Sequence, residues 1–558
     1  MTSNSNPPSP PHTPAPIDGT PPPQFGRPPE PPQGEIPVSV EGDELSVGPA
    51  FAPGAAGTPG RVWDVLVVGG GIGGLAVAGL LAQAGRAVLL LEASAQLGGA
   101  CLGVTQDGHR YDLGVGLITG AGPGGAVAAL CERLKISLPT IACDPAIQVA
   151  LSRHRVDLSR SVEGWWPEIH REFPDDEAAW HELVSDLASL AGDRDELARH
   201  LPPLPPDGWV DRFRCWRILT LQSATGVARR ATRRLRSAAQ TPFHETLAEY
   251  GLRAESRQVL EACLWYLLLR GADECSTLEA ALALQRLREG VAVTRNGPTA
   301  LADLLAQRTR EHGGEIRLQT GAARCVAERG RIVGVTTTAG ETIRARWVVT
   351  DVPPGILMGE LWPTARGFFR RRRPVQGPWQ PRCIAQVLGV AIPEAFLPSE
   401  LGWHCLVVGD AGRPACDENL VFVHRMADGL PEDAGAGLAH LCVGRFVPPS
   451  APAEGTRIAQ ALLEVLDRVI PGVESIAVHQ WLAPAPALAE LWGRPLAAVR
   501  YAVDSRAWLG RRGLAHRVGL PGLLAVGEWT YPGRLLSDVV EGAMHVADLI
   551  AARGRPNE

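Results

Sequence analysis

A glycine-rich turn near the start of the chain constrains the fold more than any other feature. Residues 62–68 form a short apolar run typical of a buried parallel strand. Gly69-x-Gly71-x-x-Gly74 follows, and residues 73–84 have the spacing of a helix. The first glycine of such a turn makes it tight, the second lets a pyrophosphate approach, and the third lets helix and strand pack closely. The helix N-terminus supplies N–H groups for phosphates.

A second apolar strand at 87–91 ends on Glu92, 23 residues after Gly69. An acid in this place can hold both hydroxyls of an adenosine ribose and repels a 2′-phosphate. Strand, glycine turn, helix, strand and acid all fall in order, so the sequence predicts a Rossmann-type dinucleotide site. The motif by itself does not separate NAD from FAD.

The same alternation returns far along the chain. We expect a helix at 298–312, strands at 315–319, 332–338, 342–349 and 522–526, and a last helix at 537–552. The pieces between them are rich in helical periodicity and in Trp. The sequence therefore predicts the α/β class, with a dinucleotide-binding domain from 61–140, 293–355 and 516–555. An inserted α+β substrate-binding domain would come from 141–292 and 356–515.

Composition narrows the setting. Residues 1–60 carry 17 of the 48 prolines and a net charge of −5, so we expect a disordered tail. The rest of the chain is nearly neutral, which gives no basic surface for nucleic acid. The 11 cysteines form no C-x-x-C pair, the first residues are polar, and no apolar run is long enough to span a bilayer. We expect a cytoplasmic protein without metal.

Three further blocks give a resemblance. They are Leu97-Gly98-Gly99, the run from Gly108 to Gly114, and the C-terminal run from Gly522 to Gly533, which contains Gly527-Glu528. With a glycine-containing turn at 294–301, they resemble the FAD oxidoreductases that include phytoene desaturases, carotenoid isomerases and retinol saturases. That group is related to the amine oxidases. The resemblance covers residues 62 to about 550 and is strongest at the two ends.

The resemblance implies FAD as cofactor and roles for particular residues. Gly98 and Gly99 would run alongside the pyrophosphate, and the backbone at Ala322 would contact the adenine. Gly527 and Glu528 would bind the pyrophosphate and ribityl chain, while Leu535 and Leu536 would edge the isoalloxazine. The implied reaction is desaturation, saturation or isomerisation at a carbon–carbon bond of a large apolar, isoprenoid or carotenoid-like substrate. No catalytic acid or base is assigned, and Asp112 and Cys101 are interpreted as structural.

Departures from the family pattern leave alternatives open. Gln96 and Ala100 stand where related amine oxidases often have arginines, and Arg494 and the residues after it replace a glycine-rich stretch. One alternative is an amine oxidase or protoporphyrinogen-oxidase type of flavoenzyme. The only lysine, Lys135, lies away from the place where amine oxidases commonly use one. The second alternative is a flavin-free prenyl-lipid carrier on the same fold, which the intact glycines and Glu92 disfavour.

Residues 209–236 combine an aromatic stripe with many arginines. Trp209, Phe213 and Trp216 fall at roughly helical spacing. Two interpretations stay open, a domain helix with a solvated face and a helix that lies at a membrane interface. The expected partners are thus an apolar small molecule and, through 209–236, a membrane surface; the sequence does not indicate the oligomeric state.

Overall fold

The computed structural model describes residues 61–552 except 115, 203, 207, 223–225, 360, 363–380, 428–436, 495–496 and 502–506. The proline-rich tail, predicted to be disordered, lies outside the described residues.

The first sheet begins with the predicted strand–helix–strand unit. It consists of β1 (Val62–Val68), α1 (Ile72–Gln83) and β2 (Val88–Leu91). The sheet has seven strands in the order β10-β2-β1-β13-β12-β11, and β20 pairs with β13. The strands β1, β2, β10, β13 and β20 pair with one another in parallel. In contrast, β12 runs antiparallel to β13 and to β11. The later strands are β10 (Glu315–Arg317), β11 (Ala322–Glu328), β12 (Arg331–Thr337), β13 (Thr342–Thr350) and β20 (Leu523–Ala525).

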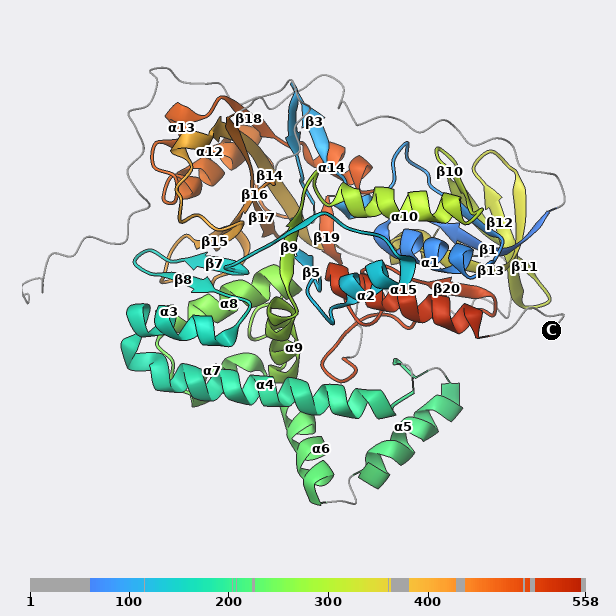
Figure 1. Cartoon of the computed structure of the whole chain (residues 1–558), viewed down its shortest axis with the longest axis horizontal. Coiled ribbons are helices and arrows are strands. Elements are labelled where there is room, and N and C mark those ends of the chain that lie inside the picture. The colour runs from blue at the N-terminus through green and yellow to red at the C-terminus, as the bar shows by residue number, and fades with distance from the viewer. Residues whose placement is uncertain are drawn as a thin grey trace, which may run out of the picture.

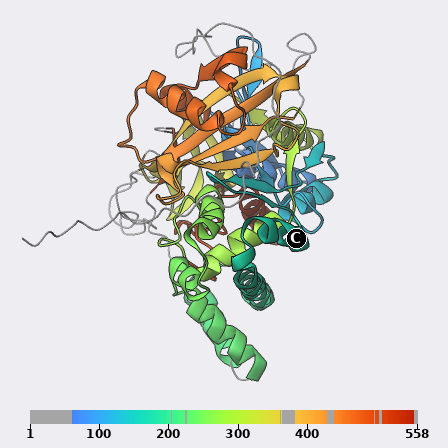
Figure 2. The ribbon, with the colours of Figure 1, turned by 90° about the vertical axis from the view of Figure 1, so that its left-hand side faces the viewer.

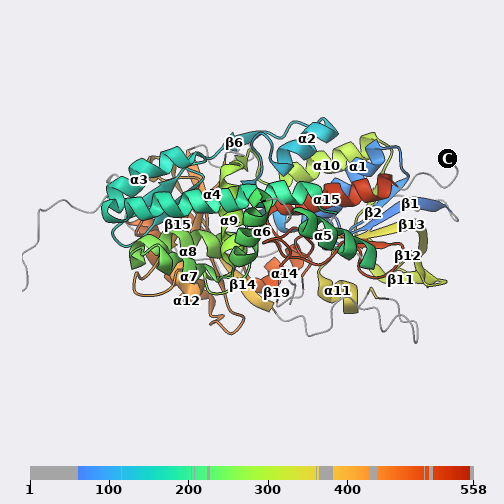
Figure 3. The ribbon, with the colours of Figure 1, turned by 90° about the horizontal axis from the view of Figure 1, so that it is seen from below.

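Both faces of this sheet are covered, which explains why its strands are apolar without alternation. Val65 and Val67 pack against helices, while Leu66 and Val68 belong to a separate core on the opposite face. Figure 3 shows the covering helices side by side. They are α1, α2 (Ala126–Leu134), α10 (Thr299–Glu311) and α15 (Leu536–Ala551).

The second sheet has eight strands in the order β18-β14-β17-β16-β15-β7-β8, with β19 paired to β14 (Figure 1, left). Its strands are β7 (Ile147–Ala150), β8 (Arg155–Leu158), β14 (Pro381–Pro393), β15 (His404–Val408), β16 (Leu420–Arg425), β17 (Leu438–Val447), β18 (His479–Leu482) and β19 (Ala498–Tyr501). One face is covered by α12 (Gly455–Leu466) and α13 (Val473–Ile476).

The helical periodicity expected between the dinucleotide-binding segments holds for only one of the two intervening pieces. Residues 141–292 form α3 (Trp165–Glu172), α4 (Glu177–His200), α5 (Gly208–Gln222), α6 (Gly226–Ala238), α7 (Phe243–Glu249), α8 (Ala254–Leu268) and α9 (Thr277–Arg288). Residues 356–515 are mostly strands. In β14, residues 385–392 are all buried, since Val387 and Leu388 enter different cores on opposite faces. A continuous apolar run is ambiguous between strand and buried helix.

Small sheets complete the architecture. A three-stranded one joins β5 (Ile118–Thr119), β9 (Val291–Thr294) and β6 (Thr140–Ala142), and β3 (Val104–Gln106) pairs with β4 (His109–Tyr111). Two short helices, α11 (Pro354–Gly359) and α14 (Ala485–Leu491), flank the sheets. The predicted α/β fold class is confirmed. Each large sheet draws only on the segments predicted for one domain, while the exact domain boundaries stay a prediction.

Helices α5 and α6 project from the body of the molecule (Figures 1 and 2). Trp209, Phe213 and Trp216 of α5 are 79%, 52% and 60% exposed. The apolar stripe predicted at 209–216 therefore faces outward. Within the described residues, no helix combines the length and apolar character needed to cross a bilayer.

Candidate functional site

A cavity of about 370 Å³ opens at the carboxyl ends of β1, β2 and β13. This is the edge at which doubly wound folds bind their ligands. Its walls come from residues far apart in the sequence and include nine of the eleven predicted site residues. These nine are Gly69, Gly71, Glu92, Gly98, Gly99, Ala322, Gly527, Glu528 and Leu536.

The other two predicted residues lie just outside this cavity. A Cβ at Gly74 would overlap the carbonyl oxygen of Gly69, so Gly74 lets the turn close. Leu535 lines a second, adjoining cavity instead.

Two glycine segments form the floor of the cavity. Gly69 has a φ of 103°, a conformation that glycine adopts readily. The Gly98 N–H donates to the Gly70 carbonyl oxygen at 2.8 Å, which places Leu97-Gly98-Gly99 directly beside the turn. Gly71 is the N-cap of α1 and offers no side-chain cap, so the N–H groups of Ile72 and Gly73 are available to a ligand. This donor set and the side-chain-free floor fit a pyrophosphate.

Glu92 stands at one end of the floor. Its Oε2 accepts from the Gly70 N–H at 2.6 Å, and its Oε1 accepts from the Ser94 N–H at 2.8 Å. Its backbone is fixed independently, because the Glu92 N–H donates to the Arg317 carbonyl oxygen of β10 at 2.9 Å. The carboxylate is therefore held in place beside the cavity, where it can accept from further donors such as ribose hydroxyls.

Asp351 is a site residue that the sequence analysis did not single out. It directly follows β13, and its Oδ2 accepts from the Gly74 N–H at the start of α1 at 2.8 Å. Burial, with smaller contributions from Glu528 and Glu92, raises the pKa of Asp351 to about 6. A Cβ at Gly71 or Gly527 would collide with this carboxylate. An acid just after a predicted parallel strand beside β1 was the available signal.

The wall of the cavity carries a second residue that the sequence analysis did not predict as a site residue. Arg494, noted above only as a departure from the family pattern, forms an ion pair with Glu528. Its guanidinium lies 5.6 Å from the ring of Trp492 and 5.5 Å from that of Trp529. All four residues line the cavity. The wall is therefore mainly aromatic, with its charges paired.

Cys101 and Asp112 have the surroundings of structural residues. Cys101 is buried, and burial followed by the nearby carboxylates raises the pKa of its thiol to about 12. The thiolate that redox or linking chemistry requires is therefore scarce at neutral pH. Asp112 is buried, its pKa is raised by burial to about 6, and its Oδ1 lies 3.7 Å from Arg110 Nε.

The raised pKa of Asp351 predicts how the stability of the ligand-free protein depends on pH. Folding favours the neutral carboxyl, so its contribution to stability falls as pH rises from about 4 through about 6. Between pH 5 and 8, the free energy of unfolding of the wild type should fall by about 1–2 kcal/mol more than that of Asp351→Asn. Urea unfolding of both proteins across this range measures the difference. Asp112 is present in both proteins, so its titration cancels in the comparison and only Asp351 contributes to the difference. A difference in stability that does not change with pH would contradict the raised pKa of Asp351.

Comparison with known proteins decides the family. The model of the flavin-containing amine oxidoreductases matches residues 72–388, which is more than half of the chain. The chain belongs to this family. It is an FAD-dependent oxidoreductase, so the predicted cofactor and enzyme class are confirmed.

Among curated proteins, the flavoenzyme is 24% identical over 522 residues to the neurosporene-forming phytoene desaturase of Cereibacter sphaeroides. This match covers 87% of the chain and 94% of the relative. A stretch of 51 residues is 57% identical to the carotenoid 3,4-desaturase of Haloarcula japonica, covering 9% of the chain and 10% of the relative. These matches confirm the resemblance to phytoene desaturases.

Among solved structures, putrescine oxidase bound to putrescine aligns with a TM-score of 0.58 at 16% identity. The alignment covers 88% of the flavoenzyme and all of the putrescine oxidase chain. An oxidoreductase from Methanosarcina mazei aligns with a TM-score of 0.57, also at 16% identity, covering 87% of the flavoenzyme and 100% of that chain. At these identities the likeness establishes the fold alone.

Proposed function

We propose that this flavoenzyme desaturates, saturates or isomerises a carbon–carbon bond of a large apolar molecule of the isoprenoid or carotenoid class. The similarity to a phytoene desaturase along 87% of the chain carries this proposal. The position of Lys135 also favours this proposal over an amine oxidase, because amine oxidases commonly use a lysine in another place. The only lysine of the sequence is exposed at the C-terminal end of α2 and is not among the residues that line the described cavity.

The residues of the cavity divide the work of holding FAD. Gly69, Gly71 and the Gly98-Gly99 segment would hold the pyrophosphate at the N-terminus of α1, with Gly74 keeping the turn closed. Glu92 would accept from the ribose, and the backbone at Ala322 would meet the adenine. Gly527 and Glu528 would bind the pyrophosphate and ribityl chain, while Leu535 and Leu536, at the N-terminus of α15, would border the flavin ring.

The chemistry that FAD supplies when bound is hydride exchange with a substrate carbon. The chain's own contribution is to orient the substrate and keep water away. Trp492 and Trp529 supply apolar surface on the cavity wall, and Arg494 between them is neutralised by Glu528. Desaturation removes a hydride from one carbon and a proton from its neighbour, and saturation adds both, so a group that accepts or donates this proton must complete the reaction. No side chain is assigned to that role.

Anaerobic mixing tests the proposal. The flavin-loaded enzyme is mixed with detergent-solubilised phytoene, with neurosporene, and with putrescine, while the flavin absorbance near 450 nm is followed. Bleaching by a polyene but not by the amine supports the proposal. Bleaching by putrescine alone would establish an amine oxidase instead.

We also propose that the exposed stripe of α5 docks on an anionic membrane surface. A substrate of this class resides in the bilayer, so an enzyme must reach the lipid to collect it. Trp209, Phe213 and Trp216 provide the apolar contact, and Arg212, Arg214 and Arg217, which are also exposed, provide the charge. Aromatic side chains flanked by arginines are typical of helices that lie at the interface.

Replacing both Trp209 and Trp216 with alanine should weaken co-sedimentation with phosphatidylserine vesicles about tenfold or more, because two large apolar contacts with lipid are lost. Flavin absorbance should stay unchanged, since α5 is remote from the cavity residues. Binding should also weaken with salt, because arginine attraction is screened over about 10 Å at 0.1 M. Val478→Ala, at another exposed apolar position, is the control. A double variant that loses stability and flavin together would show a packing role instead.

A further inference from the structure

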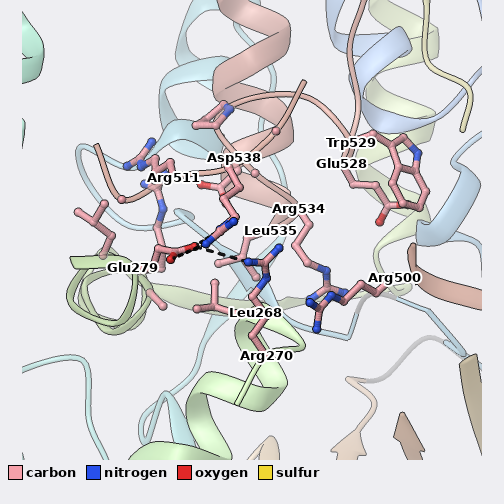
Figure 4. Close-up of a pocket in the computed structure, with 18 of the residues that line it drawn as sticks. Leu268, Arg270, Glu279, Arg500, Arg511, Glu528, Trp529, Arg534, Leu535 and Asp538 are labelled. Carbon is pink, nitrogen blue, oxygen red and sulfur yellow. Dashed lines mark hydrogen bonds and ion pairs between the residues drawn. The ribbon is translucent and has the colours of Figure 1, made fainter. Parts of the chain in front are cut away.

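A second cavity, of about 140 Å³, adjoins the first one (Figure 4). Glu528, Trp529 and Arg534 line both cavities, so the second cavity reaches the expected flavin region. Its wall is unusual in charge, with six arginines and three carboxylates. The arginines are Arg270, Arg286, Arg500, Arg511, Arg512 and Arg534, and the acids are Glu279, Glu528 and Asp538.

Most of these arginines are fixed in place by acids at or behind the wall. Glu279 caps α9 and is shared by Arg512, at 2.5 Å, and Arg270, at 3.8 Å. Arg286 binds Asp538 at 2.5 Å. Arg500 and Arg511 are held from outside the cavity lining, by Glu274 at 2.9 Å and Glu541 at 2.8 Å. Arg286 also pairs with Glu289 and Glu541. Arg500 has Glu274 as its one carboxylate partner among the described residues, and its bond uses Nη1, so this guanidinium with five N–H donors keeps donors for a ligand.

Arg534 is different, because it has no carboxylate within ion-pair distance among the described residues. Its Nη1 donates to the carbonyl oxygen of Leu267 at 3.0 Å, and its buried Nε has no hydrogen-bond partner in that part of the chain. Burial lowers the pKa of this guanidinium. Such a charge with an idle donor is costly unless an anion completes it.

Arg270 adds to the unbalanced charge. Burial, then repulsion from Arg512 and Arg500, lowers its pKa to about 10, and its contact with Glu279 is the longest of the set. In Figure 4 the side chains of Arg270, Arg500 and Arg534 all reach toward the middle of the cavity. Three guanidinium groups thus face one small space between them.

We propose that this cavity binds a carboxylate at the end of an otherwise apolar substrate, with Arg270, Arg500 and Arg534 as its ligands. Arginine forks match the planar geometry of a carboxylate. The volume suits such a group with a few adjoining carbons, because a water molecule takes about 30 Å³ and a long polyene needs far more. The inference rests on the proposed function and narrows its substrate class to acids.

Flavin absorbance titrations of the flavin-loaded enzyme test the inference with a matched pair of probes, farnesoic acid and farnesol. These differ only in carboxylate against alcohol. We expect the acid to bind about 10- to 100-fold more tightly, because charge-assisted bonds to arginine are lost with the alcohol. Arg270→Gln should remove this preference and leave alcohol binding unchanged. Arg457→Gln, on an exposed arginine of α12, should keep it.

Arg534→Lys provides a second variant, in which the charge remains but the fork is lost, so we expect a weaker preference for the acid in the flavin-loaded fraction of this variant. Inorganic phosphate should compete with farnesoic acid for the wild-type cavity. Equal binding of acid and alcohol by wild type, or a preference that survives Arg270→Gln, would overturn the inference. Phosphate binding without an acid preference would do so too, by showing a site for free anions only.

The two proposals fail in different ways. Bleaching of the flavin by neutral polyenes, without any acid preference, removes the inference and keeps the proposed function. An acid preference in an enzyme whose flavin is bleached by putrescine and not by a polyene removes the proposed function and keeps the anion site.

Discussion

Replacing Gly74 with alanine is expected to leave the purified protein nearly free of flavin. The added Cβ would overlap the carbonyl oxygen of Gly69 and come within 3.2 Å of Val67 Cγ1. Both neighbours belong to the strand and turn on which the pyrophosphate would rest, so relief of the clash must open the turn. Overpacking of this kind costs about 1–3 kcal/mol or more, which corresponds to an affinity for FAD about 5- to 150-fold weaker.

Gly79→Ala is the matched control, because Gly79 lies in the same helix. The nearest atoms to its Cβ are 3.5 Å away, an ordinary contact. In a helix interior, alanine is more stable than glycine by about 0.5–1 kcal/mol, so this variant should retain flavin and melt slightly higher. The ratio of absorbance at 450 nm to that at 280 nm, measured after gel filtration, compares the two. Loss of flavin from both variants would mean that α1, not the turn, is what alanine disturbs.

Glu92→Ala should also strip flavin from the protein, by removing bonds instead of adding a clash. Each charge-assisted hydrogen bond to a ribose hydroxyl contributes about 1.5–3 kcal/mol. The Gly70 N–H also loses its acceptor at 2.6 Å, which loosens the turn. The backbone at this position stays fixed through Arg317 and Thr320, so folding should be preserved. Fluorescence of flavin released during extensive dialysis, and the dissociation constant on reconstitution, measure the effect.

Glu315→Ala is the control for the loss of an acid near this edge of the sheet. Glu315 belongs to β10, the neighbour of β2, and its exposed ion pair with Arg61 contributes little. That variant should keep wild-type flavin content. Full occupancy of Glu92→Ala after dialysis would show that the ribose is held elsewhere.

The sequence predicts which residues form the floor of the larger cavity because local rules determine this part of the fold. One short unit, from Gly69 to Glu92, contains the tight turn, the start of the helix and the acid after the second strand. Asp351 was also within reach, since it follows a predicted strand that pairs with β1. The arginine-rich cavity was not. Its six arginines come from the segment of α8 and α9, from β19, and from loops around 511 and 534, and no periodicity connects them.

The second sheet shows the other limit of sequence patterns. Its central strand, β14, enters a core on each face, so its apolar residues do not alternate with polar ones. The pattern that separates a half-buried strand from a helix is therefore lost. Only the pairing of β14 with β17, β18 and β19, set by residues 45 to 120 positions away, selects the extended form.

The order in which the first sheet is assembled from the chain has a consequence for biosynthesis. The glycine turn at Gly69 leaves the ribosome early, but β20, Gly527 and the N-terminus of α15 emerge more than 400 residues later. At about 5–20 residues per second, the nascent chain would wait roughly 20–90 s before the last residues that line the cavity are made. Flavin can thus be captured in full only after β20 and the start of α15 have been synthesised. A message truncated before β20 should yield protein that never turns yellow, however much FAD the cell supplies.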